Sequence, residues 1–360
     1  MKSHGATRTF GILASGGDCP GLNSLIRGVA EAATNRYNMN IIAFVNGYRG
    51  FIAGEAHTLR SGEFGTIAIP DGSPIDTGLD SHERSLAVED AYVGARETEA
   101  VVDTYRRFQL DSLVVIGGYD ALKTAYVLSA RGLHVVFVPK TINNNIWRTD
   151  LTYGFYSAAE IAAEAIERLH TTARSHNRIM VIEVMGHTTG WLALHSGIAA
   201  GADVILIPEI PYRVEVIHRH LDARAQRGRH FSIMVAAEGA ADAATAQNGR
   251  RRALRSSSIA YQLAEQLQRA AGMEARANVL GYQQRGGRPA AYDSILAARF
   301  GATVAEMLHR GDFGSMVALS GNRTVHYPLG HVAGTLRKVP PDHDLLVAAR
   351  ATGTCVGDED

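Results

Sequence analysis

The chain has 360 residues, of which 46% are hydrophobic and 20% charged. This balance excludes a disordered or fibrous protein, and the length allows two domains of ordinary size. Because 36 basic residues equal 36 acidic ones, no net field attracts the protein to nucleic acid or to an anionic membrane. Any anion-binding site must therefore be local.

Cysteine content and the N-terminal sequence indicate the compartment. The chain has two cysteines, Cys19 and Cys355, which lie at opposite ends of the sequence. Two cysteines are too few for a disulfide framework, and their spacing does not suit a zinc site. No apolar run approaches the roughly 18 residues of a membrane span, and the N-terminus lacks the apolar segment of a signal peptide. We expect a cytoplasmic protein.

Short apolar runs alternate with glycine- or proline-bearing turns and helical stretches, a pattern typical of βαβ units. Several runs are apolar on both faces, as strands of a parallel sheet are. A helix is expected from residue 155 to residue 169, where apolar side chains recur at helical spacing. The sequence predicts an α/β fold with doubly wound sheets. Strands are expected at residues 10–14, 41–45, 113–116, 135–138, 179–184, 204–207 and 233–237.

Two segments in the C-terminal half of the chain lack the alternation of strands and helices. Residues 240–258 are rich in Ala, Arg, Ser and Gln, which predicts an exposed insertion or a loop with a helix. Its run of three arginines at 250–252 is interpreted as a solvated surface rather than a nucleic-acid site. Residues 356–360 are expected to form a frayed acidic tail.

In open α/β sheets, ligands bind beyond the carboxyl ends of the strands, where helix N-termini gather. The first strand is followed by SGGDCPGLN, in which Gly16 and Gly17 allow backbone N–H groups to approach a phosphate. Two further turns follow later strands: one contains Gly117 and Gly118, and the other contains Lys140, a point charge suited to phosphate. Each turn alone can also serve only to pack a strand against a helix.

Later turns add polar groups of the same kind. Met185, Gly186 and His187 follow one strand, and Glu238 follows another. Arg285 lies in the stretch GYQQRGGR, where guanidinium groups beside two glycines suit bidentate binding of phosphate oxygens.

Eight segments occur here in the order and spacing of the phosphofructokinases: SGGDCPGLN, VVIGG, PKTIN, SHNR, VIEVMG, GWLALHSG, VILIPE and VLGYQQRGG. The chain thus resembles that family over about residues 8–310, with GWLALHSG and Lys140 most similar to its actinobacterial and pyrophosphate-using branch. The resemblance implies two Rossmann-like domains with the active cleft between them. It places a larger donor-side domain at 1–155 plus 285–325, a smaller sugar-phosphate domain at 156–284, and a C-terminal segment and tail at 326–360.

The resemblance also implies which residues hold the sugar phosphate. By resemblance, the acceptor's phosphate and hydroxyls are bound by Arg178, Arg276 and Arg285. The sugar is contacted by Met185, Gly186 and Glu238. In the family, the first two arginines reach across from a neighbouring subunit, which implies a homodimer or homotetramer. The substrate site also includes His187 and Tyr282. Tyr282 stands where the family usually has His and His187 where it usually has Arg, so the acceptor is left open between fructose 6-phosphate and an analogue.

The catalytic motifs depart further from the family. Asn143 occupies the place of the Asp that takes the acceptor's proton, and an amide has no useful basicity. Asn145 and Tyr119 replace two more carboxylates. The remaining candidates by resemblance are Thr141 near the transferred group, Lys140, and Asp120 as catalytic residue or weak Mg²⁺ ligand.

The phosphoryl donor is open between ATP and pyrophosphate. By resemblance, the donor's phosphates are held by Gly16, Gly17, Gly117, Gly118, Tyr119 and Asp120. Asp120 and Lys140 match the pair typical of pyrophosphate-dependent members, and the nucleotide-side Arg of a G-S-x-R turn is missing from residues 72–79.

Three functions are compatible with these residues. The first is a sugar-phosphate phosphotransferase, with phosphoryl or diphosphoryl transfer to a ketose phosphate and with altered donor or acceptor position. The second is an inactive protein that binds the sugar phosphate as a sensor. The third is a different reaction, such as isomerisation, for which His187 and Tyr282 are the acid–base candidates.

Overall fold

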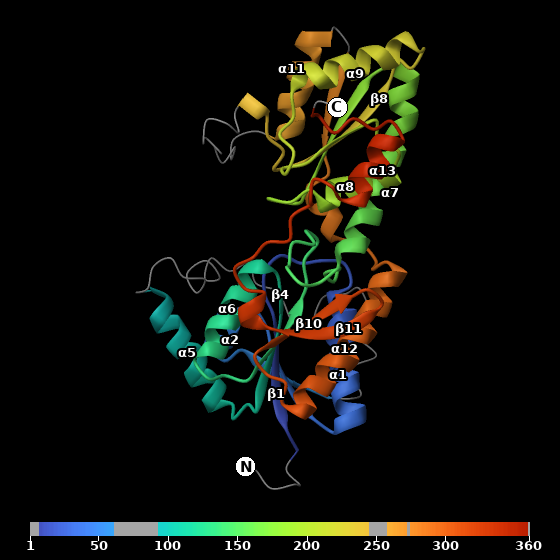
Figure 1. Ribbon diagram of the computed structural model, residues 1–360. Coiled ribbons are helices and arrows are strands. Elements are labelled where there is room, and N and C mark those ends of the chain that lie inside the picture. The colour runs from blue at the N-terminus through green and yellow to red at the C-terminus, as the bar shows by residue number, and fades with distance from the viewer. Residues whose placement is uncertain (1–6, 61–92, 245–257, 272–273, 359–360) are drawn as a thin grey trace. The chain divides into compact units, whose positions relative to one another are not determined.

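The computed structural model describes residues 7–60, 93–244, 258–271 and 274–358. It divides into two compact units (Figure 1), and the chain passes between them several times. Unit 1 comprises residues 1–141, 146–154 and 288–336, and unit 2 comprises residues 142–145, 155–287 and 337–360.

Unit 1 is built on a seven-stranded sheet in the order β11-β10-β5-β4-β1-β2-β3. Its five inner strands are parallel, while β3 pairs antiparallel with β2 and β11 antiparallel with β10. The central strands read TFGILA, SLVVIG and VVFVP and are almost entirely buried, as expected where helices cover both faces. The bounds are β1 Thr9–Ala14, β2 Asn40–Phe44, β3 Ala56–Leu59, β4 Ser112–Gly117, β5 Val135–Pro139, β10 Ser315–Ser320 and β11 Arg323–Pro328.

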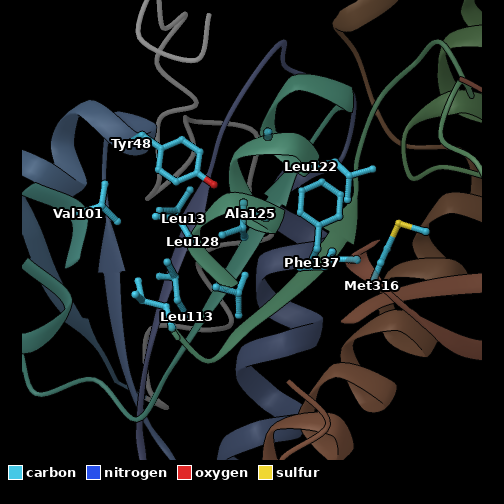
Figure 2. Close-up of a cluster of buried hydrophobic side chains, with 14 of the residues drawn as sticks. Leu13, Tyr48, Val101, Leu113, Leu122, Ala125, Leu128, Phe137 and Met316 are labelled. Carbon is cyan, nitrogen blue, oxygen red and sulfur yellow. The ribbon is translucent and has the colours of Figure 1, made fainter. Parts of the chain in front are cut away.

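The helices of unit 1 lie on both sides of this sheet (Figure 1). On one side α1 (Leu22–Tyr37) packs along α12 (Ala291–Arg310), and on the other lie α2 (Gly47–Ala53), α5 (Val93–Arg107) and α6 (Tyr119–Ala130). Figure 2 shows the hydrophobic core between the strands of this sheet and the helices α2, α5 and α6. In this core, Leu13, Tyr48 and Phe137 are fully buried. A short 3₁₀ helix, η3 (Leu329–His331), follows β11.

Unit 2 contains a four-stranded parallel sheet in the order β7-β8-β6-β9. Its strands are β6 Ile179–Val184, β7 Val204–Leu206, β8 Ser232–Ala237 and β9 Ala275–Val279. Because all four strands run the same way, the segments that follow β6, β8 and β9 leave the sheet at one edge.

In the described part of unit 2, five helices lie around the sheet. The first two, α7 (Phe155–His176) and α8 (Trp191–Ala199), pack on each other and on the strands, and α13 (Asp344–Ala351) packs on α8. The pair α9 (Val214–Gln226) and α11 (Ile259–Ala271) supplies Leu221 and Leu263 to a core with Val181 and Met234. A 3₁₀ helix, η2 (Gly281–Arg285), follows β9.

The predicted α/β fold is confirmed, and all seven predicted strands are present within one or two residues. Strands β3, β9, β10 and β11 were not predicted, and α7 runs beyond residue 169 to His176. The predicted insertion at 240–258 lies mostly in residues 245–257, outside the described residues, as do residues 72–79.

The prediction of a frayed tail from residue 356 is wrong for residues 356–358. Val356 is buried, the Gly357 carbonyl accepts a hydrogen bond from the Arg213 N–H at 2.8 Å, and the Ile205 N–H donates to the Cys355 carbonyl. The acidic composition suggested solvation, but the chain instead extends the edge of the sheet beside β7.

Candidate functional site

In unit 1, Lys140 joins the two glycine-rich turns predicted to bind phosphate. Its backbone N–H donates to the Gly117 carbonyl at 2.8 Å. Its ammonium donates to the carbonyls of Ser15 at 3.1 Å and Gly17 at 2.7 Å, with Gly16 at 3.5 Å. The side chain is 1% exposed. Lys140 was predicted to offer a charge to phosphate, whereas its described bonds fix the shape of the turn.

Replacing this ammonium tests that structural role. Lys140→Met leaves the turn carbonyls without their buried charged donor, so the free energy of unfolding should fall by about 3 kcal/mol. Urea unfolding measures the change. Lys123→Met is the matched control, since the Lys123–Asp120 pair is partly exposed and such pairs contribute less than about 1 kcal/mol. Equal effects of the two substitutions would contradict the role assigned to Lys140.

The second glycine turn opens α6. A Cβ on Gly117 would come within 2.4 Å of the Ala121 side chain, so packing alone requires that glycine, whereas a Cβ on Gly118 would meet nothing closer than 3.8 Å. Gly118 therefore leaves space beside the helix N-terminus, where backbone N–H groups favour anions. Thr141 follows Lys140, and its N–H donates to the Tyr153 carbonyl at 3.1 Å.

Tyr119 and Asp120 are both engaged by Lys123. The Lys123 ammonium lies 4.6 Å from the centre of the Tyr119 ring and 3.0 Å from the Asp120 carboxylate. Tyr119 also packs against the unit 1 core. Among the described residues, no three His, Cys, Asp or Glu side chains gather closely enough to hold a metal ion. A Mg²⁺ ion at this turn would depend on the Asp120 carboxylate together with phosphate oxygens of the donor, the kind of ligand set that Mg²⁺ usually has in kinases.

In unit 2, the asparagine loop of residues 143–145 is anchored through its backbone. The Asn143 carbonyl accepts a hydrogen bond from the Thr189 hydroxyl at 3.2 Å. The Asn144 and Asn145 carbonyls both accept from Arg337. Asn145 Oδ1 is buried without a hydrogen-bond partner among the described groups.

A cavity of about 200 Å³ lies at the carboxyl edge of the unit 2 sheet. It is lined by Glu183, Val184, Met185, Glu238, Gly281 and Tyr282. These residues belong to β6 or follow β6, β8 and β9, as the topology requires. Three residues predicted to contact the sugar, Met185, Glu238 and Tyr282, are thus brought together in one cavity.

Glu238 shapes one wall of this cavity. Its Oε1 accepts hydrogen bonds from the N–H groups of Gly186 at 3.3 Å and His187 at 2.6 Å. His187 has a φ of +54°, and its carbonyl lies 2.0 Å from where a Cβ on Gly239 would be. Glycine at 239 and the carboxylate at 238 therefore let the loop fold closely over the end of β8. The His187 side chain is exposed.

The opposite wall is η2, where Arg285 lies with its guanidinium 5.4 Å from the Tyr282 ring centre. Gln284 holds this turn: its Oε1 accepts from the Met185 N–H at 3.3 Å and its amide donates to the Gly281 carbonyl at 3.0 Å. Sequence reasoning missed Gln284, Thr189 and Arg337, because each acts through contacts with residues distant along the chain.

Arg178 and Arg276 do not join this cavity. Both lie at the amino-terminal ends of β6 and β9 and pair with Glu274, Arg178 at 2.8 Å. The hydrogen bond from Arg178 comes first among the causes that lower the pKa of Glu274. The cavity is at the other end of the same strands, about 17 Å away for a six-residue strand. Within one chain these arginines cannot reach it.

Glycine turns at the carboxyl ends of parallel strands, and a cavity at the carboxyl edge of a parallel sheet, are typical of α/β proteins that bind small phosphorylated or hydroxylated ligands. The chain matches the family model described as Phosphofructokinase over residues 9–308. It belongs to the phosphofructokinase family, which confirms the resemblance and makes the protein one of a family of kinases, a class of transferase.

Known proteins resemble the whole chain. An ATP-dependent 6-phosphofructokinase of Spirochaeta thermophila is 52% identical, with 98% of each chain covered. The ATP-dependent 6-phosphofructokinase 3 of Bacteroides thetaiotaomicron is 41% identical, over 97% of this chain and 99% of the relative. Among solved structures, the pyrophosphate-dependent phosphofructokinase of Nitrosospira multiformis superposes with a TM-score of 0.81 at 20% identity, over 98% of this chain and 93% of that one.

No helix in the described part of the chain is both long and apolar enough to cross a membrane.

Proposed function

We propose that the protein transfers a phosphoryl group from ATP to a ketose phosphate such as fructose 6-phosphate. The observation that carries this proposal is the cavity lined by Met185, Glu238 and Tyr282, three residues that the family resemblance assigns to the sugar. ATP is proposed as donor because relatives at 52% and 41% identity are named ATP-dependent enzymes.

The proposed chemistry relies on positioning more than on acid–base catalysis. Phosphoryl transfer passes through a loose transition state in which the protein mainly aligns the reactants and stabilises charge. Asn143 cannot serve as a base, but its amide can hydrogen-bond the acceptor hydroxyl. Arg285, beside the cavity, supplies fixed positive charge for the acceptor's phosphate. Gly118 leaves room for a donor phosphate at the N-terminus of α6.

Ligand-dependent melting tests this proposal. A ligand that binds only the folded state raises the melting temperature, so fructose 6-phosphate and ATP should each raise it when added separately. A response to pyrophosphate in place of ATP would overturn the donor assignment. A response to the sugar phosphate alone would favour a sensor.

The sensor is the second candidate because of one specific observation. Lys123 holds Tyr119 and Asp120 at the donor turn, while Met185, Glu238 and Tyr282 still line a cavity for the sugar. Such a protein would bind the ketose phosphate without turnover.

We further propose that the acceptor site is completed by a second copy of the chain. Arg178 and Arg276 lie at the opposite end of the sheet from the cavity of their own unit, and their partner Glu274 is partly exposed. Partly exposed pairs of this kind are weak, so both guanidiniums can exchange Glu274 for a ligand phosphate. A symmetric dimer would then place them at the neighbour's cavity.

Mixing two inactive variants tests the shared site. At a fructose 6-phosphate concentration near the wild-type KM, Arg276→Ala and Glu238→Ala should each lose most activity alone. In a dimer the mixed species regains one intact site, so co-expression should restore about a quarter of wild-type activity. A mixture no more active than its components would show that each chain uses its own arginine.

A further inference from the structure

Arg337 lies beyond the segment matched by the family model, which ends at residue 308, yet it binds the asparagine loop. Its backbone N–H donates to the Asn145 carbonyl at 3.0 Å. Its guanidinium Nη1 donates to the Asn144 carbonyl at 3.3 Å. One residue therefore holds two successive carbonyls of the loop that carries Asn143.

Trp191 supports Arg337 in this position. The guanidinium carbon lies 4.0 Å from the centre of the indole ring, and the indole N–H donates to the Arg337 carbonyl at 2.9 Å. Trp191 is 2% exposed, so its ring is a fixed platform. A cation over the face of tryptophan is attracted by the ring, and a planar guanidinium is better suited to such stacking than an ammonium.

The loop itself needs external support. Asn144 has a φ of +49°, a left-handed conformation that asparagine adopts more readily than most residues other than glycine, but still at a cost. Such a conformation persists only where surrounding contacts determine it. The surrounding contacts here include the hydrogen bond from Thr189 to Asn143 and the two hydrogen bonds from Arg337.

We infer that Arg337, seated on Trp191, is a positioning residue that fixes Asn143 for the transfer step. The inference rests on the proposed phosphotransferase function. Arg337 acts through the loop backbone, and no contact between Arg337 and the residues of the sugar cavity is required. Because a displacement of about 1 Å at a reacting group can cost on the order of 10²-fold in rate, loss of this support should lower kcat rather than weaken sugar binding.

Kinetics of Arg337→Met test the inference. With fructose 6-phosphate and ATP, kcat should fall about 10²-fold, while KM for the sugar phosphate stays within about threefold of wild type. Arg337→Lys should recover part of the loss, since an ammonium can still donate to the Asn144 carbonyl but stacks less well. The control is Arg350→Ala, which lies in the same C-terminal segment and pairs with Asp358 rather than with the loop.

A second readout reports the position of the guanidinium directly. The pKa of His195 is lowered to about 4, chiefly by burial and next by the charge of Arg337. NMR titration of His195 should show a higher pKa in Arg337→Met and an unchanged one in Arg350→Ala. If Arg337→Met does not fold, the same kinetics and titration are measured on Trp191→Phe. This variant keeps an aromatic ring but loses the indole N–H that donates to the Arg337 carbonyl.

The outcomes separate this inference from the proposed function. If folded Arg337→Met keeps kcat within about twofold of wild type, or loses binding and turnover equally, the positioning role is wrong. If the wild type itself shows no transfer, the proposed function fails. The inference is then read from hydrogen exchange at the amides of residues 142–146, which should be about tenfold faster in Arg337→Met. Unchanged exchange would overturn it.

Discussion

Glu238→Ala is expected to raise KM for fructose 6-phosphate by about 10²-fold, the equivalent of 2–3 kcal/mol. The substitution removes the acceptor for the Gly186 and His187 N–H groups. It also removes a carboxylate from the cavity wall, where it can accept hydrogen bonds from sugar hydroxyls. Steady-state kinetics with varied sugar phosphate measure the effect.

Two further variants serve as controls for the Glu238→Ala result. Glu238→Gln keeps an oxygen that can accept from the loop, so it should lose less affinity than the alanine variant. Glu265→Ala removes a carboxylate of similar type from α11, where it pairs on the surface with Arg269, and should leave KM unchanged. If both alanine variants keep wild-type KM, the cavity is not the acceptor site.

Asn143→Asp is expected to raise kcat by about 10²-fold or more, because it supplies the general base that an amide cannot replace. The rate should also become pH-dependent. A carboxylate accepts a proton only when ionised, so activity should rise as pH increases through the pKa of the new aspartate and fall below it. Initial rates between pH 4 and 8 measure both effects.

The matched control is Asn38→Asp, the same change of charge at the exposed C-terminal cap of α1, which should leave kcat unaltered. A decrease in kcat for Asn143→Asp would contradict the assignment, since it would mean that the site uses the amide itself or excludes negative charge.

The sequence could predict the sheet strands that are apolar along their whole length. Residues 113–116 and 135–138 read as buried parallel strands, and they are. β9, with the sequence ARANV, carries a charged and a polar residue and is only partly buried, so its composition gave no strand signal. The pairing of β9 with β6 depends on contacts between segments about a hundred residues apart.

For the candidate site, the sequence could likewise predict which residues follow the strands, but not the contacts that their side chains make. The rule that ligands bind at the carboxyl ends of parallel strands correctly grouped Met185, Glu238 and Tyr282. It could not show that Lys140 directs its ammonium at the carbonyls of the first turn, nor that Arg337 supports the asparagine loop, because side-chain direction and long-range pairing are absent from local patterns. The roles of these residues in turnover are the subject of the proposals above.

The most direct measurement of the proposed activity is a ³¹P NMR time course of the purified protein with Mg²⁺, fructose 6-phosphate and ATP, with parallel samples containing pyrophosphate or other ketose phosphates. We expect ATP resonances to decline while ADP and a new sugar phosphate-ester resonance appear, at a position that identifies the modified hydroxyl. Spectra in which the sugar phosphate lines broaden or shift on binding, while no new ester forms with either donor, would contradict transfer and identify the protein as a sugar-phosphate sensor.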